Sequence, residues 1–264
     1  KVSCVVLEAS TFDCPKLLNN NQSCCQKYNC DRNFNSPNFL KEVQKICKIN
    51  NIVLIVDETI TGFRWHFKGA CHKYNIKPDL VIFGKAIANG FSLAVLGGNK
   101  KIMSLGSIDK PKNERVFLLS TTHGAEMSSL AAANQTIKML SDGKKIKKIW
   151  DHGTKLIKNI NMISLKHKME KNIWLYGLPC SPYMLTNIDN KNSFELKTLL
   201  QEELIKHKVL MPWISISSAH GDKEADYVIG VFSKIIPKIK KIIGKDFENR
   251  KFKNLLKPVF RKYN

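Results

Sequence analysis

Short apolar runs alternate with helical repeats through the first two thirds of the chain. The run Ile52–Val56 is uninterrupted and leads into Asp57 and Glu58, and the run Leu80–Phe83 leads into Gly84 and Lys85. Uninterrupted runs of this length are typical of central strands in a parallel sheet that is covered on both faces. The pattern therefore predicts an α/β fold with a mostly parallel central sheet.

The same patterns predict the other elements of this part. Further strands are expected at 2–8, 93–96 and 116–119. Apolar residues at helical spacing predict helices at 38–49, 126–139 and 145–162. Since ligands of open α/β sheets bind at the carboxyl ends of the strands, we look for the functional site there.

A change of composition near residues 165–172 separates a second part. Its expected elements are strands at 173–178, 183–188 and 209–211 and helices at 193–207 and 223–243. We predict a large domain over residues 1–168, a smaller C-terminal α+β domain over 169–245 and a basic tail over 246–264.

The formal net charge of +21 raises the question of nucleic-acid binding. Only five of the 43 basic residues are arginines, the residue whose planar fork suits phosphates and bases best. We therefore expect solvated surface lysines and no nucleic-acid partner. No apolar run approaches the length of a membrane-spanning helix, so no membrane insertion is expected.

Eight cysteines raise the question of a metal site. Four of them lie in the polar stretch 14–30, with a spacing that matches neither paired C-x-x-C motifs nor a Cys/His finger. The others stand singly in apolar or helical surroundings, as small core or near-surface residues do: Cys4, Cys47, Cys71 and Cys180. We expect no metal, and reduced thiols in a cytoplasmic protein. The role of the 14–30 stretch stays open.

Asp57 and Lys85 carry the candidate chemistry. An acid after an apolar strand also occurs in P-loop nucleotide hydrolases, but the chain lacks the G-x-x-x-x-G-K-[ST] loop that these proteins require. The alternative is an Asp that keeps a cofactor's pyridine nitrogen protonated. A strand-end Lys between the small residues Gly84 and Ala86 can form an imine with an aldehyde. Taken singly, these residues are better explained as a capping or salt-bridged Asp and a surface Lys.

The combination is more specific. Asp57-Glu58-Thr59-Ile60-Thr61-Gly62-Phe63-Arg64, followed by Pro78-Asp79 and Gly84-Lys85, resembles the signature of class-III aminotransferases, which depend on pyridoxal phosphate (PLP). The Thr-Gly-Phe-Arg ending is most similar to the glutamate-1-semialdehyde 2,1-aminomutase branch. The similarity continues through 97–98 and 120–126 to 218–220. It implies fold type I of the PLP-dependent transferases, PLP as cofactor, a small-molecule amino donor or acceptor, and a homodimer.

The resemblance implies a role for each matching residue around the cofactor ring. Lys85 would form the Schiff base with PLP and shuttle protons, and Asp57 would pair with the pyridinium nitrogen. Thr59 would pack on the ring face, where the family usually has a branched apolar residue. Ile60 would lie near the phenolic edge of the ring.

Two further matches lie at the margin of this site. Thr122 matches the threonine that reaches the cofactor phosphate of the neighbouring subunit, although an ordinary helix N-cap explains it equally well without the family. Glu8 matches a glutamate near the active-site entrance, although Ala9 replaces the proline that usually follows.

The chain starts abruptly within a predicted strand. In the family, a longer N-terminal part supplies the Gly/Ser turn around the phosphate and the aromatic residue that stacks on the ring. We therefore expect a fragment, one half of a split enzyme, or a decayed copy. The expected function is PLP-dependent amino-group transfer by a transaminase or an aminomutase. The alternative is a non-catalytic or split-enzyme fragment that retains the fold.

Overall fold

The computed structural model describes residues 1–9, 37–111, 114–116, 124, 126–247 and 250–257. The described residues fold as two compact units, the first up to Lys147 and the second from Lys148 onward. This division falls inside a helix, α7 (Lys144–Lys166). The domain bounds 1–168, 169–245 and 246–264 stay a prediction.

Several sequence-based expectations lie outside the described residues. They are most of the strand predicted at 116–119, the candidate Thr122, the cysteines of the 14–30 stretch and the end of the tail after residue 257.

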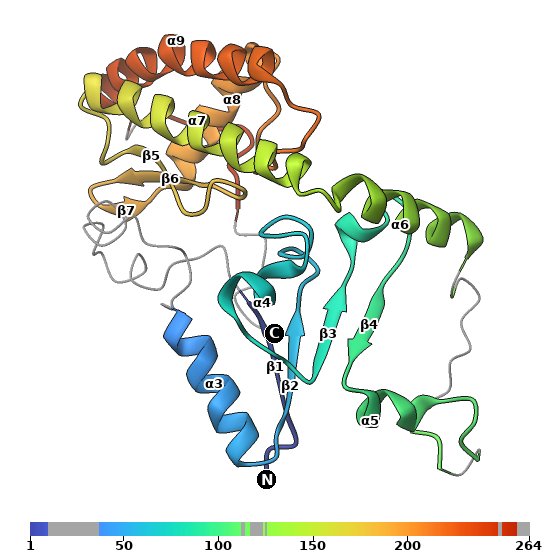
Figure 1. Cartoon of the computed structure of the whole chain (residues 1–264). Coiled ribbons are helices and arrows are strands. Elements are labelled where there is room, and N and C mark those ends of the chain that lie inside the picture. Colours follow the sequence, from blue (N-terminus) through green and yellow to red (C-terminus); the bar gives the residue numbers. More distant parts are fainter. Residues whose placement is uncertain (10–36, 112–113, 117–123, 125, 248–249, 258–264) are drawn as a thin grey trace. The chain divides into compact units, whose positions relative to one another are not determined.

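A four-stranded sheet forms the centre of the first unit (Figure 1). Its strands follow the order β1 (Cys4–Glu8), β2 (Val53–Asp57), β3 (Leu80–Phe83) and β4 (Val95–Gly98). The first three strands are parallel, and β4 runs antiparallel to β3. The predicted α/β fold with a mostly parallel sheet is thus confirmed, and the apolar runs at 52–56 and 80–83 are its two inner strands.

Helices flank this sheet. They are α3 (Pro37–Ile49), α4 (Gly69–Tyr74), α5 (Lys100–Met103) and α6 (Met127–Leu140), with short 3₁₀ turns η1 (Lys85–Ile87) and η2 (Ser104–Gly106). Ala133 of α6 packs with Ile87 and Ala88, and the partly buried Phe83 and Val95 cover this cluster. The chain that directly follows Lys85 is therefore anchored in an apolar cluster.

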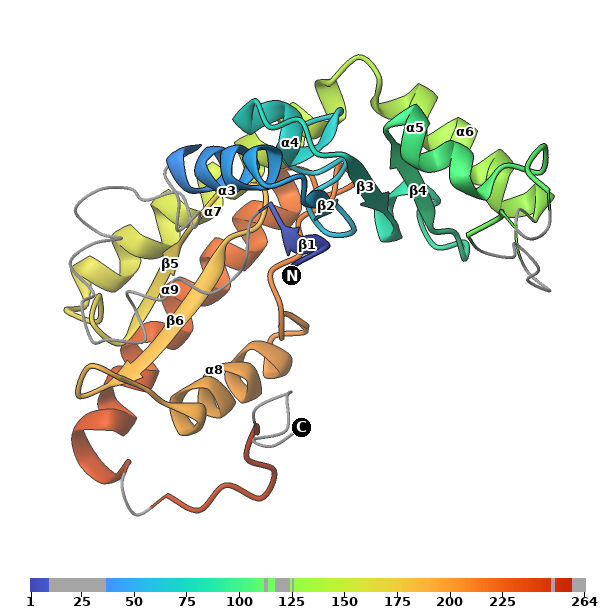
Figure 2. The ribbon, with the colours of Figure 1, turned by 90° about the horizontal axis from the view of Figure 1, so that it is seen from below.

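The second unit combines α7 with β5 (Ile173–Tyr176), β6 (Tyr183–Ile188), β7 (Lys191–Asn192), α8 (Phe194–Lys206) and α9 (Asp222–Asp246) (Figure 2). The three strands form an antiparallel sheet in sequence order, and α8 contacts both β6 and α9. The fully buried side chains come from all of these layers: Ile160, Ile173, Leu175, Leu196, Leu199, Leu200, Leu204, Phe232, Ile235, Ile236 and Ile239.

Two buried polar side chains within this core, Asn161 and Glu203, are paired. The buried Asn161 of α7 accepts the N–H of Leu175 through Oδ1 at 2.8 Å and donates from Nδ2 to the Leu175 carbonyl at 2.7 Å. The buried Glu203 of α8 binds Lys206 and, across the helix pair, Lys238 of α9, each at 2.7 Å. Burying such groups is tolerable only because each finds partners.

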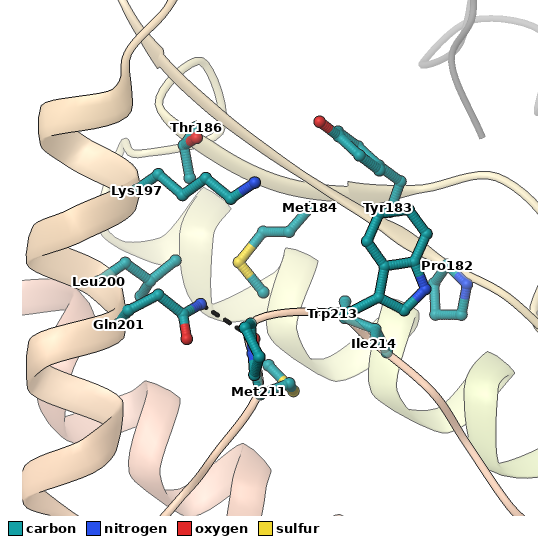
Figure 3. A pocket seen from close by; sticks show the side chains of 11 residues that line it. Pro182, Tyr183, Met184, Thr186, Lys197, Leu200, Gln201, Met211, Trp213 and Ile214 are labelled. Atoms are coloured by element: carbon teal, nitrogen blue, oxygen red, sulfur yellow. Dashed lines mark hydrogen bonds between the residues drawn. The ribbon is translucent and has the colours of Figure 1, made fainter. Parts of the chain in front are cut away.

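The prediction of a strand at 209–211 is wrong. These residues are irregular, and their backbone is bonded to helix α8 instead of to a strand. The N–H of Val209 donates to the Leu204 carbonyl at 2.9 Å, and the Met211 carbonyl accepts Nε2 of Gln201 at 2.9 Å (Figure 3). The alternation of buried Val209 and exposed Leu210 imitates a strand pattern, so the apolar spacing alone predicted one.

The structure describes the four cysteines that stand singly in the sequence. Cys47, Cys71 and Cys180 are buried, Cys4 is exposed, and all four are free thiols. Within the described ranges, no helix is long and apolar enough to span a membrane. The same part of the chain holds no cluster of three or more His, Cys, Asp or Glu side chains suited to a metal ion.

Candidate active site

The carboxyl ends of β1, β2 and β3 form one edge of the first sheet. Glu8 is the register partner of Asp57, and Asp57 is the register partner of Ile82 in β3. Lys85 follows two residues after the end of β3. The parallel sheet thus brings two carboxylates and one primary amine from distant parts of the sequence to the edge where α/β proteins bind ligands.

The charges at this edge influence one another. The pKa of Glu8 is raised, chiefly because its carboxyl is partly withdrawn from water and secondly because Asp57 carries the same charge. The positive charge of Lys85 acts in the opposite direction. Glu8, Asp57 and Lys85 therefore share one electrostatic environment, although Glu8 and Lys85 are both exposed.

A local turn holds the carboxylate of Asp57. Its Oδ1 accepts the backbone N–H of Thr59 at 2.8 Å. The backbone N–H of Glu58, the residue that follows Asp57, donates to the Ile82 carbonyl at 2.8 Å. The chain therefore stays hydrogen-bonded to β3 for one residue beyond the end of β2. The half-buried Asp57 is thereby fixed at the strand end.

Thr59 lies close to the backbone that precedes Lys85. A Cβ added to Gly84 would lie 3.2 Å from Cγ2 of Thr59, tighter than ordinary van der Waals contact. Glycine thus allows the two strand ends to approach each other. Thr59 and Ile60 are both half-buried, so they keep accessible surface at this edge.

Lys85 has an unusual backbone. Its φ of +43° lies in the left-handed region, which costs a non-glycine residue on the order of 1–2 kcal/mol. Ile87 and Ala88, both buried, hold the chain after it and stabilise this conformation. Strained backbone of this kind concentrates at functional sites.

Glu58 is the residue that sequence reasoning missed. Its carboxylate is buried and accepts the N–H groups of Ala70 at 2.9 Å and Cys71 at 2.7 Å, and the Thr61 hydroxyl. A Cβ on Gly69 would lie 2.6 Å from its Oε1, and Gly69 has a φ of +84°. Glu58 thus closes the loop from Asp57 to α4. The signal was an acid next to Asp57 and, further along the chain, a glycine at the first position of a short helix.

The pKa of Cys71 is raised far above its ordinary range, first by burial and then by the negative charge of Glu58. A buried thiol of this kind stays protonated and unreactive. Cys71 therefore belongs to the packing beneath the strand ends and is no candidate nucleophile.

The donor set at the strand ends fits PLP. A primary amine can form an imine with an aldehyde, and a carboxylate one strand away can hold a proton on a ring nitrogen. Gly84, which directly precedes Lys85, has little room for a side chain beside Thr59. The expected phosphate contact, Thr122, is outside the described residues.

Solved structures share the fold. The PLP internal aldimine form of the FumI protein from Sphingopyxis sp. matches with a TM-score of 0.70 and 19% identity, over 80% of this chain and 49% of that one. The fold is accordingly that of the PLP-dependent transferases, as the sequence predicted.

The family follows from the sequence match. The class-III aminotransferase family model matches residues 31–215, and this chain belongs to that family. The matched residues include Asp57, Thr59, Ile60, Lys85 and Thr122 but not Glu8.

Two curated relatives represent different activities. A 3-aminobutyryl-CoA aminotransferase of Cloacimonas acidaminovorans is 28% identical over 211 residues, which are 78% of this chain and 49% of the relative. A glutamate-1-semialdehyde 2,1-aminomutase of Nitrosopumilus maritimus is 42% identical over 104 residues, 39% of this chain and 23% of the relative. The chain thus spans about half the length of the first and under a quarter of the second.

Proposed function

We propose that this protein takes part in PLP-dependent amino-group transfer and that Lys85 is the residue that binds the cofactor covalently. The observation that carries the proposal is the placement of Lys85 after β3, beside Asp57 at the end of β2, within the family-matched part of the chain. Membership of the class-III aminotransferase family supports it.

When bound, PLP would supply the aldehyde that joins Lys85 as a Schiff base and the ring that withdraws electrons from the substrate carbon. Lys85 Nζ would be the amine that holds the cofactor and the base that moves a proton at the substrate carbon. The carboxylate of Asp57, which accepts the Thr59 N–H, would keep the ring nitrogen protonated. Thr59 and Ile60 offer half-buried surface for the ring face and its phenolic edge.

The remaining candidates belong to the margin of the proposed site. Glu8, whose electrostatic environment includes Asp57 and Lys85, faces the substrate side in this proposal. Thr122 lies outside the described residues, and in this proposal it would reach the phosphate of the cofactor held by a second copy, in a homodimer. The substrate is a small amino compound or carbonyl compound, and both transamination and aminomutation are compatible with the two relatives.

The test is covalent trapping. The protein is incubated with PLP, reduced with borohydride, digested and mapped by mass spectrometry. We expect the label on the peptide that contains Lys85, and its loss in Lys85→Arg. The matched control Lys100→Arg replaces another exposed lysine of the first unit and should keep the label. A label spread equally over surface lysines, or full turnover by Lys85→Arg, would contradict the proposal.

Asp57→Asn tests the proposed role of the Asp57 carboxylate, because the substitution removes the charge and nearly keeps the shape of the side chain. Loss of the carboxylate charge removes the electrostatic support for the ring nitrogen, so turnover should fall by about 100-fold or more while trapping on Lys85 persists. A protein that gives neither label nor turnover would instead support the alternative, a non-catalytic or split-enzyme fragment with the aminotransferase fold.

A further inference from the structure

One residue of the signature segment after Asp57 has no part in the proposed function, and its backbone is unusual. Phe63 has a φ of +59°, in the left-handed region that a bulky side chain rarely adopts. Such a conformation costs free energy and persists only where the surrounding contacts determine it. The neighbours of Phe63 must therefore hold it firmly.

Hydrogen bonds attach the backbone around Phe63 to the strand end that carries Asp57. The N–H of Gly62, the residue before Phe63, donates to the Glu58 carbonyl at 2.8 Å. The carboxylate of Asp57 in turn accepts the Thr59 N–H at 2.8 Å. Consecutive hydrogen-bonded turns therefore join Phe63 to Asp57, and a displacement of one is transmitted to the other.

The half-buried ring of Phe63 packs on the segment that carries Lys85. Its centroid lies 5.6 Å from that of Phe83, the last residue of β3, which stands two positions before Lys85. The same ring packs against the buried cluster that contains Ile87 and Ala88. Phe63 thus contacts a residue that precedes Lys85 and the cluster that holds the residues after it.

The two segments meet closely at two glycines. A Cβ on Gly62 would lie 2.7 Å from Cδ1 of Phe83 and 2.7 Å from the Glu58 carbonyl oxygen. A Cβ on Gly84 would lie 3.2 Å from Cγ2 of Thr59. Both distances are shorter than ordinary van der Waals contact, so glycine is what allows the approach. The spacing of the two segments then depends on the side chains that fill the contact between them.

Lys85 depends on the same apolar cluster. Its φ of +43° is left-handed as well, and the N–H of Ile87 donates to the Gly84 carbonyl at 3.2 Å across it. The buried Ile87 and Ala88 anchor the chain beyond this turn. Two left-handed residues, Phe63 and Lys85, are thus supported by one cluster, so we expect a change at Phe63 to reach Lys85.

We infer that Phe63 is a positioning residue, which fixes the backbone of Lys85 relative to the carboxylate of Asp57. The inference rests on the proposed function, since amino-group transfer is what gives the spacing of Lys85 and Asp57 a chemical meaning. One cofactor ring would have to meet both residues at once, and a misplacement of about 1 Å in such a site can lower a reaction rate about 100-fold.

Two aldehydes that differ at one ring atom test the inference. The full chain is incubated with PLP or with 1-deazapyridoxal phosphate, in which carbon replaces the ring nitrogen, and is trapped with borohydride. The concentration that half-labels Lys85 is measured for each aldehyde. The wild type should prefer PLP, because the Asp57 carboxylate can bind its ring nitrogen. Phe63→Leu should reduce this preference about five-fold and change the affinity for the deaza compound less than about two-fold.

Amide hydrogen exchange of the cofactor-free protein is the second readout. Phe63→Leu should speed exchange of the Ile87 amide about five-fold or more, because loss of the ring loosens the cluster beside Lys85. Phe63→Tyr keeps the ring and should restore the wild-type values in both experiments. Phe67→Leu is the matched control in the same loop. The Phe67 ring meets that of Phe63 at 6.0 Å, but among the described residues it is not one of those packed on the cluster, so labelling and Ile87 exchange should stay unchanged.

Equal loss of affinity for both aldehydes, or faster exchange within 58–67 without a change at Ile87, would overturn the inference, because Phe63 would then only pack its own loop. Phe63→Met, with a flexible apolar side chain that adapts to gaps, replaces Phe63→Leu if that variant does not fold. A wild type without label on Lys85 would contradict amino-group transfer, whereas the exchange comparison would still decide whether Phe63 holds the Lys85 segment.

Discussion

Glu8 and Asp57 are register partners at the carboxyl ends of two hydrogen-bonded parallel strands. Register partners lie on the same face of a sheet, so their like charges repel. Partial burial is the main cause that raises the pKa of Glu8, this repulsion adds to it, and Lys85 offsets part of the rise. Burial and strand pairing together thus make Glu8 an acid that holds its proton more readily than a free glutamate.

Glu8→Gln should remove a pH dependence of stability. Because the folded pKa is raised, folding is favoured below the ordinary value of 4.5, and this contribution is lost as pH rises through the folded pKa. The variant should therefore gain stability relative to the wild type between about pH 4 and about pH 7. Since Glu8 is exposed, we expect a gain under about 1 kcal/mol.

Urea unfolding at both pH values measures this gain. Glu42→Gln, at an exposed position of α3, serves as control and should show no such trend. If the stability of the wild type rises relative to that of Glu8→Gln as the pH increases, the raised pKa of Glu8 is refuted.

Glu58→Gln should destabilise the first unit. A carboxylate satisfies both the Ala70 and Cys71 N–H groups, whereas the amide of Gln turns its own N–H₂ toward one of them. The expected cost in free energy of unfolding is about 1–3 kcal/mol, measured by chemical denaturation. Thr61→Val removes a single donor and should cost less. Equal stability of Glu58→Gln and wild type would show that the buried bonds carry no net energy.

Glu203 should govern part of the acid unfolding of the second unit. Burial by itself would raise its pKa, but hydrogen bonds and charge from Lys206 and Lys238 outweigh burial and lower it. A lowered folded pKa gives stability that is present above the ordinary value of 4.5 and lost as pH falls through the folded pKa.

The wild type should therefore lose more stability than Glu203→Gln between about pH 6 and about pH 3. The control is Glu202→Gln at the adjacent, half-buried position, whose ion pair with Arg250 is 3.4 Å long. Parallel acid unfolding curves for wild type and Glu203→Gln would contradict the prediction.

Two helical glycines should respond to alanine in opposite directions. A Cβ on Gly153 in α7 would overlap the Pro179 carbonyl, a backbone group that has little freedom to move. Gly153→Ala should cost about 2 kcal/mol or more despite the better helix propensity of Ala. Gly230 in α9 has nothing within 4 Å of such a Cβ, so Gly230→Ala should stabilise by up to about 1 kcal/mol. Thermal unfolding of both variants decides the matter, and stabilisation in both would disprove the close approach at Pro179.

The apolar runs were sufficient to predict the strands that carry the candidate site. Leu54 and Val56 of β2 are buried on one face, and the half-buried Val53 and Ile55 lie on the other face, so this inner strand needs an uninterrupted apolar run. The strand predicted at 183–188 is also confirmed. The helix predicted at 193–207 extends from Phe194 to Lys206, so it is one residue shorter at each end than predicted. Such patterns report burial, which is why they succeed here.

Burial patterns do not report strand direction or side-chain partners. The antiparallel course of β4 rests on its pairing with β3 across a turn that no residue spacing reveals. The segment 209–211 has the alternation of a strand, but the amide of Gln201 takes the Met211 carbonyl that a neighbouring strand would need. The left-handed φ of Lys85 and the closure by Glu58 likewise depend on contacts distant in sequence.

The hydrogen bonds of Asn161 affect whether the sheet of the second unit can pair with a strand of another chain. Among the described residues, Leu175 lies in β5, the edge strand in the order β5-β6-β7, and an unpaired edge strand is a template for another chain. The amide of Asn161 binds both the N–H and the carbonyl of Leu175, as a residue of a neighbouring strand would. These two backbone groups are therefore not available to pair with a strand of another chain. A single side chain of a helix thus protects the border of this small sheet against aggregation.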